Sequence, residues 1–256
     1  MPVENQIGSQ GEGSVKPDFS SVLTVFVQAA GQNPNHADCL TALQNQTVGF
    51  VLDIVRDFSP IPAALQEMQN RCKTPYYIGV DEDMILYPDS VEKMFKEMTA
   101  APEMTALMIF LLRDVHLDER IFGVKVYRTA FVRKFPYNQT TTACDSEQAD
   151  RIKRSECLVD HKYIVMGEHS PKWTCPLIFE RYLNLMEKYK QYGYEWIAKV
   201  PAKLGQIYRR SPSEINLFAL LGAYTSLVSK TPLLLREKDF REVREELQTL
   251  RKLLPE

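Results

Sequence analysis

The segment Pro75–Asp83 (PYYIGVDED) decides the fold class, because a strand pattern runs directly into three acidic residues. Residues 75–80 are mostly apolar and aromatic, as in a strand that is buried on both faces. Two similar runs precede this segment, at residues 21–30 (SVLTVFVQAA) and 48–55 (VGFVLDIV). Helical patterns separate the runs, and this alternation over about 80 residues predicts an α/β fold with a mostly parallel central sheet flanked by helices.

The intervening helices are predicted from apolar residues at helical spacing. The first covers residues 37–43. The second is expected to begin at Ser59 and Pro60, where a hydroxyl side chain would cap the first turn. Asp89 or Ser90 is expected to cap a third. Each helix therefore follows a predicted strand, as a parallel sheet requires.

The second half of the chain has a different pattern. Residues 105–112 and 121–127 read as neighbouring short strands, which suggests a mixed extension of the sheet. Residues 179–197 form an amphipathic pattern rich in tyrosine, residues 215–228 favour a buried helix, and residues 239–254 carry an apolar stripe. We expect a disordered leader (1–20), an α/β core (21–176) and a helical C-terminal extension (177–256) packed on that core.

Composition excludes several classes of protein. The 256 residues include 31 Lys and Arg against 33 Asp and Glu, a net charge of −2, which argues against nucleic-acid binding through bulk positive charge. No apolar run reaches the roughly 20 residues that a membrane span needs, although peripheral membrane contact stays open. The five cysteines are scattered and include no C-x-x-C pair, so a reducing cytoplasm is the expected location.

The acidic triplet Asp81-Glu82-Asp83 is the first candidate site. Two carboxylates at positions i and i+2 after a strand can converge on one hard cation, and oxygen ligands suit Mg²⁺ or Mn²⁺. Such a cation would in turn neutralise a diphosphate. The alternative is an acidic turn without a metal, and the triplet alone does not decide between the two.

In its order of motifs, the chain resembles the nucleotide-sugar glycosyltransferases of GT-A fold, family-2 type. The resemblance covers residues 21–165. It rests on the opening strand, on Leu43–Thr47 (LQNQT), on Asp57–Ser59 at a strand end, on Tyr77–Asp89 (YIGVDEDMILYPD) and on Asp145–Ile152 (DSEQADRI). It implies a Rossmann-like mixed sheet, with residues 21–100 as the nucleotide-sugar-binding half and residues 101–176 as the acceptor and catalytic half.

The resemblance also implies roles for individual residues. The donor would be bound by Asp57, Asp81 and Glu82 and by the backbone near Ala29. Asp83 and Asp81 would hold Mn²⁺ or Mg²⁺, with His169 as a further metal ligand. Two departures stand out: the opening strand ends in Gln28-Ala29-Ala30-Gly31 instead of the family's Pro-Thr-Tyr-Asn, and Cys144 replaces the first acid of its Glu-Asp pair.

Asp145 would be the general base of an inverting reaction, with Glu147 as the alternative base. An acceptor hydroxyl is a poor nucleophile, so a carboxylate must take its proton during attack. The expected function is transfer of a sugar from a nucleotide-diphosphate sugar, UDP-linked in the first instance, to a glycan or lipid-linked acceptor. This would occur in the cytoplasm, with peripheral contact at the inner face of the membrane left open. Two alternatives are a degenerate nucleotide-sugar-binding or scaffold protein and a nucleotidyltransferase.

Overall fold

The computed structural model describes residues 16–29, 33–141, 143–192 and 196–228. The strands are β1 (Leu23–Ala29), β2 (Val51–Arg56), β3 (Tyr76–Asp81), β4 (Met84–Leu86), β5 (Thr105–Asp114), β6 (Glu119–Arg128) and β7 (Leu158–His169). The helices are α1 (His36–Gln44), α2 (Ile61–Arg71), α3 (Ser90–Ala100), α4 (Thr129–Val132), α5 (Cys144–Lys153), α6 (Cys175–Tyr192), α7 (Trp196–Arg210) and α8 (Glu214–Val228).

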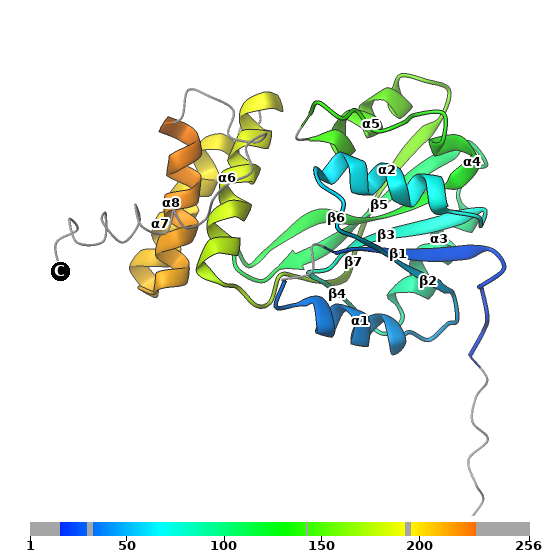
Figure 1. The fold of residues 1–256 in the computed structure, drawn as a ribbon, viewed down its shortest axis with the longest axis horizontal. Helices are drawn as coiled ribbons and strands as arrows, with labels where there is room; N and C mark the ends of the chain where they lie inside the picture. Colours follow the sequence, from blue (N-terminus) through cyan, green and yellow to red (C-terminus); the bar gives the residue numbers. More distant parts are fainter. Residues whose placement is uncertain (1–15, 30–32, 142, 193–195, 229–256) are drawn as a thin grey trace, which may run out of the picture.

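The strands form one mixed sheet in the order β2-β1-β3-β6-β5-β7-β4. The pairs β1–β2, β1–β3 and β5–β7 are parallel, whereas β6 and β4 run antiparallel to their neighbours. Five strands therefore share one direction, which confirms the mostly parallel α/β sheet expected from the sequence. Helices α2, α4 and α5 lie on one face of the sheet and α1 and α3 on the other, while α6, α7 and α8 gather beside it (Figure 1).

Alternation along the strands builds a core on each face of the sheet. Val25 and Val27 point into the cluster that α1 and α3 cover, whereas Phe26, between them, points into the cluster beneath α2 and α5. In β5, Met108 and Phe110 point into the first of these clusters, and Leu107 and Ile109 point into the second. A strand covered on both faces must be apolar throughout, which explains the continuous apolar runs in the sequence.

Helices α6, α7 and α8 share a third apolar cluster, which includes Tyr182 and Ala223 and reaches Leu117 in the turn between β5 and β6. Tyr182 is thus a core residue of this helical region. The predicted helix at residues 179–197 is wrong in extent, because α6 ends at Tyr192 and α7 begins at Trp196. Among the described residues, no helix has both the length and the apolar composition needed to cross a bilayer.

Close contact between α6 and α8 depends on Gly222. A Cβ atom at this position would lie 2.2 Å from the backbone oxygen of Phe179, too close for any side chain. We therefore expect Gly222→Ala to lower the free energy of unfolding by about 1–3 kcal/mol, the usual cost of overpacking. Gly205→Ala in α7 is the matched control, because nothing lies within 4 Å of its Cβ position. The control should raise stability by about 0.5–1 kcal/mol, as helix propensity predicts. Urea denaturation of both variants measures the difference, and equal stabilities would contradict the close packing.

Some local predictions need correction, and others fall outside the described residues. Helix α2 begins at Ile61, after a cis Ser59–Pro60 peptide bond, and Ser59 does not cap it. Asp89 is the N-cap residue of α3, but its side chain makes no capping hydrogen bond. Within the predicted leader, Asp18 forms a β-bridge with Gly49, so its last residues are ordered. Residues 1–15 and the predicted helix at 239–254 lie outside the described residues.

Candidate functional site

The predicted donor-binding residues lie at the carboxyl ends of the adjacent strands β1, β2 and β3. The Asp57 amide donates to the carbonyl oxygen of Ala29 at 3.4 Å, and the Glu82 amide donates to that of Gln28 at 3.0 Å. Asp57 is exposed and has a positive φ of 61°. Asp81 ends β3, in register with Gln28 of β1. The structure thus brings Ala29, Asp57 and Asp81 to one edge of the sheet, where ligands collect in α/β folds.

Glu82 points elsewhere. Its side chain is buried, and its Oε2 lies 3.2 Å from Nδ1 of His36 at the start of α1. Arg56 lies at 3.4 Å from the other ring nitrogen of His36. The contact between Glu82 and His36 connects the acidic triplet to α1, so Glu82 helps to hold the triplet in place.

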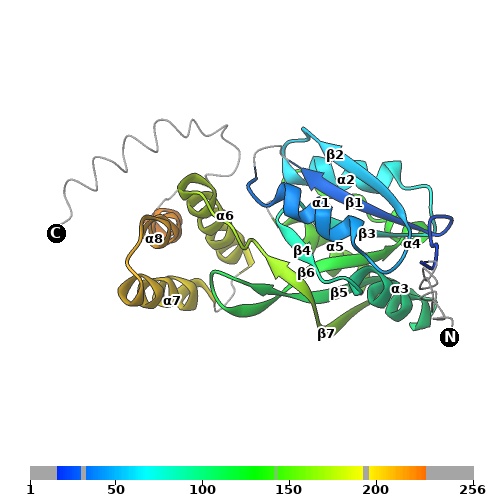
Figure 2. The same ribbon diagram turned by 90° about the horizontal axis from the view of Figure 1, so that it is seen from below.

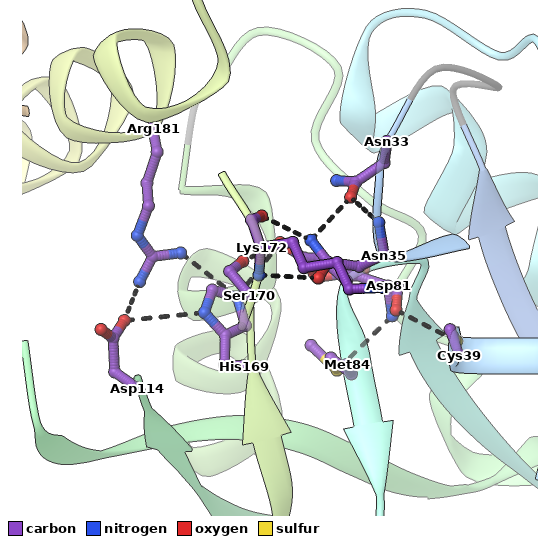
Figure 3. A network of polar contacts seen from close by, with 11 residues as sticks. Asn33, Asn35, Cys39, Asp81, Met84, Asp114, His169, Ser170, Lys172 and Arg181 are labelled. Carbon is purple, nitrogen blue, oxygen red and sulfur yellow. Dashed lines mark hydrogen bonds and ion pairs between the residues drawn. The ribbon is translucent and has the colours of Figure 1, made fainter. Parts of the chain in front are cut away.

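Asp83 lies next to the end of β7. Its backbone oxygen accepts from the Ser170 amide at 2.8 Å, and its Oδ2 accepts from the Ser170 hydroxyl at 2.5 Å. The same Oδ2 lies 3.6 Å from Nε2 of His169. This short stretch of β7 thus brings His169 to the acidic triplet, from more than 80 positions further along the chain. Figure 3 shows His169 and Ser170 in the same network of polar side chains as Asp81.

The Asp81 carboxyl group is exposed at the surface but closely surrounded by other charges. Desolvation by the surrounding protein and the negative charge of Asp83 raise the pKa of Asp81 to about 6, although Lys125 and His169 oppose the shift. A carboxylate whose pKa is raised by a second carboxylate nearby is characteristic of sites that hold a cation.

Asp145 is held between two lysines from different parts of the chain. It lies in the first turn of α5, as predicted. Its Oδ2 accepts from Lys125 of β6 at 3.1 Å, and its Oδ1 accepts from Lys188 of α6 at 3.1 Å. Burial tends to raise the pKa of Asp145, but the two ammonium groups hold it well below its usual range. Asp145 is therefore ionised at neutral pH.

Lys125 connects Asp145 with the acidic triplet. Burial lowers the pKa of Lys125, but the negative charges of Asp145 and Asp81 outweigh burial and raise it. In the β3–β6 register Lys125 is paired with Gly79, and Gly79 lies two residues before Asp81. Glu147, the alternative base, instead forms an ion pair with Arg151 one turn along α5, at 2.6 Å. Of the two acids, Asp145 is the one that faces Lys125 and, through it, Asp81.

A divalent cation fits this site only in part. Within the described residues, no group of three or more His, Cys, Asp or Glu side chains is arranged to hold a metal ion. However, Oδ1 of Asp83 is buried without a hydrogen-bond partner, and a buried oxygen of this kind needs a donor or a cation. Mg²⁺ is typically held by one or two carboxylates together with substrate phosphates. Asp83 and Asp81 are the two carboxylates that would belong to such a set.

Several residues of the site were missed from the sequence. Lys125 occupies an ordinary alternating position in a strand, Asp114 follows a long apolar strand, and Arg181 and Lys188 lie in an amphipathic helix. One signal existed: Arg181 and Lys188 are seven residues apart and thus on one helix face. Nothing in the sequence, however, indicated that this face of α6 meets the sheet.

Comparison with solved structures identifies the fold. No protein-family model and no curated protein matches this sequence. The mannosyltransferase PcManGT from Pyrobaculum calidifontis, solved with GDP-Man and Mn²⁺, is similar over 93% of this chain and 83% of its own, at 13% identity and a TM-score of 0.52. Residues 1–349 of TarS from S. aureus are similar over 86% of this chain and 77% of theirs, at 10% identity and a TM-score of 0.47. Glucosyl-3-phosphoglycerate synthase from Mycobacterium tuberculosis is similar over 66% and 78%, at 11% identity and a TM-score of 0.48.

The likeness to the mannosyltransferase shows that this chain has a GT-A-like, Rossmann-related fold. The fold class expected from the sequence is therefore confirmed. At 13% identity the likeness concerns the fold alone, and the roles of individual residues rest on the geometry described above.

Proposed function

We propose that this protein is a metal-assisted glycosyltransferase that uses a nucleotide-diphosphate sugar. One observation carries the proposal. On a GT-A-like fold, Asp81 and Asp83 lie at the strand ends, and Asp83 has a buried oxygen without a hydrogen-bond partner. Lys125 lies between this acidic pair and Asp145. The solved mannosyltransferase of this fold carries GDP-Man and Mn²⁺. For the present chain a UDP- or GDP-linked sugar is the proposed donor, and Mn²⁺ or Mg²⁺ the proposed cation.

The proposed chemistry divides between two groups of residues. Asp83 and Asp81, with His169 nearby, would hold the cation, which supplies positive charge for the leaving nucleoside diphosphate. Asp145 would accept the proton of the acceptor hydroxyl as its oxygen attacks the anomeric carbon and the bond to the diphosphate breaks. Attack on the face opposite the leaving group inverts the anomeric centre. Asp57 and the Ala29 backbone lie where they can contact the nucleoside.

The acceptor is proposed to be a glycan or a lipid-linked glycan. The proposed location is the cytoplasm, with peripheral contact at the inner face of the membrane. Cys39, Cys72, Cys144 and Cys157 are buried thiols in the structure, which fits a reducing compartment.

A second candidate function is nucleotide-sugar binding without transfer. It is favoured by the two lysines on Asp145, because a carboxylate with a strongly lowered pKa is a weak proton acceptor. An active enzyme would need Lys188 to withdraw from Asp145 when the acceptor binds. Lys188 comes from α6, outside the sheet, so this withdrawal would leave the β-strands unchanged.

Thermal unfolding with nucleotides tests the proposal. UDP or GDP at about 100 times its Kd should add about 2.7 kcal/mol of stability with Mn²⁺ present, a rise in Tm of about 5 °C or more. Excess EDTA should abolish the shift, and inorganic phosphate should not reproduce it. Release of sugar from the stabilising nucleotide then separates an enzyme from a binding protein. A Tm unchanged by every nucleotide, with or without Mn²⁺, would refute both candidate functions.

A further inference from the structure

A buried ion pair lies directly behind His169. Asp114, at the end of β5, is fully buried and forms an ion pair with Arg181 of α6. Asp114 and His169 are partners in the β5–β7 register, so the two strand ends place these side chains next to each other. Oδ2 of Asp114 lies 3.6 Å from Nδ1 of His169. Figure 3 shows Asp114, Arg181 and His169 as one connected group.

Arg181 determines which ring nitrogen of His169 carries the proton. Its Nη1 lies 3.2 Å from Nε2 of His169. A guanidinium group has only N–H donors, so Nε2 must be the accepting nitrogen with a free lone pair. In the neutral ring the proton is then on Nδ1, which faces Asp114 at a separation of 3.6 Å, in ion-pair contact but without a hydrogen bond. This tautomer leaves the Nε2 lone pair on the side of Asp83, whose Oδ2 is 3.6 Å away.

We infer that Asp114 and Arg181 are positioning residues that hold His169 in the tautomer and orientation required for an Nε2 metal ligand beside Asp83. The inference rests on the proposed metal site. Metal-binding histidines commonly donate their other N–H group to a carboxylate, which fixes the ring and increases its basicity. In the metal-free protein the Arg181 N–H group occupies the position of the Nε2 lone pair, and a cation between His169 and Asp83 would replace that contact.

The separation of the two ligand groups agrees with this assignment. Two neighbouring ligands of one octahedral cation, each about 2.1 Å from it, lie about 3 Å apart. Nε2 of His169 and Oδ2 of Asp83 are 3.6 Å apart without any cation. The side chains of Asp114 and His169 are only 1% and 10% exposed, so water competes little for their contact. Ser170 follows His169 directly, and its hydroxyl donates to the same Oδ2 of Asp83.

Mn²⁺ binding, followed by electron paramagnetic resonance with and without UDP or GDP, tests the inference. Asp114→Asn and His169→Ala should each weaken Mn²⁺ binding about tenfold to hundredfold, the usual effect of losing an outer partner or a ligand. Asp114→Glu should restore much of the affinity. Asp118→Asn is the matched control, because Asp118 lies in the same β5–β6 turn but is exposed and pairs with Arg113. It should bind Mn²⁺ as the unaltered protein does.

The single change Asp114→Asn leaves the buried charge of Arg181 without its partner, which destabilises the fold. The double variant Asp114→Asn/Arg181→Met removes both charges, so a loss of Mn²⁺ binding in it does not come from an unpaired buried charge. Nitrogen-15 NMR of the ring gives a readout independent of metal: the unaltered protein should show His169 with its proton on Nδ1, and Asp114→Asn/Arg181→Met should show a mixture of tautomers. If Asp114→Asn binds Mn²⁺ normally, with or without Arg181→Met, or if His169→Ala does, the inference is overturned. If the unaltered protein binds no Mn²⁺ even with nucleotide, or Asp83→Asn binds it normally, the proposed metal site itself fails.

Discussion

Replacing Asp83 with Asn should abolish the Mn²⁺-dependent rise in Tm with nucleotide and reduce sugar release from the donor by about a thousandfold or more. This expectation follows from the Asp83 carboxylate, whose Oδ1 is buried without a hydrogen-bond partner and whose Oδ2 lies 3.6 Å from Nε2 of His169. Without the cation, the charge that develops on the leaving diphosphate is not compensated. A metal ion contributes several kcal/mol to such a transition state, and about 4 kcal/mol corresponds to a thousandfold in rate.

The substitution is designed to preserve the fold. An Asn side chain keeps the volume of Asp and still offers an oxygen to the Ser170 hydroxyl, which donates to Asp83 in the structure. Asp89→Asn is the matched control, because Asp89 is the next acid along the chain and pairs only with Lys93 at the surface of α3. Nucleotide-dependent stabilisation and turnover that survive in Asp83→Asn would exclude Asp83 as the metal ligand.

The sequence predicted the part of the site that depends on local order. The apolar part of strand β3 runs directly into Asp81-Glu82-Asp83. The first turn of α5 carries two acidic residues, Asp145 and Glu147. Residues next to each other in sequence stay next to each other in the fold. A strand that is buried on both faces can therefore be identified, and its carboxyl end located, without a structure.

The remaining part depends on contacts across the chain. Strand β7 was not predicted because much of it is partly exposed and its sequence is mixed (LVDHKYIVMGEH), without a continuous apolar run. Its neighbour β4 is only three residues long. The position of His169 beside Asp83 arises from this pairing. In the same way, Lys188 meets Asp145 only because α6 packs beside the sheet (Figure 2), and periodicity describes the face of a helix but not its partner.

Replacing Asp145 with Asn should reduce transfer to the acceptor by about a hundredfold to ten-thousandfold, the usual contribution of a general base. Donor binding should change little, because Asp145 contacts two lysines and Lys125 lies between it and the acidic triplet. Glu147→Gln is the matched control: Glu147 pairs with Arg151 on the surface of α5 and should affect transfer less than about threefold. The opposite result, with Glu147→Gln inactive and Asp145→Asn active, would identify Glu147 as the base.

A Lys188 variant shows whether the loss of activity in Asp145→Asn is the loss of a general base or the loss of a structural contact. Removing its ammonium group in Lys188→Met allows the pKa of Asp145 to rise, since Lys188 is one of the two charges that lower it. Transfer requires ionised Asp145, so the acid limb of kcat/KM should move to higher pH in Lys188→Met while Asp145→Asn loses that dependence. A base that acts on the acceptor must show this shift. A carboxylate that only anchors α6 to the sheet would instead leave the pH profile unchanged and lower the stability of both variants.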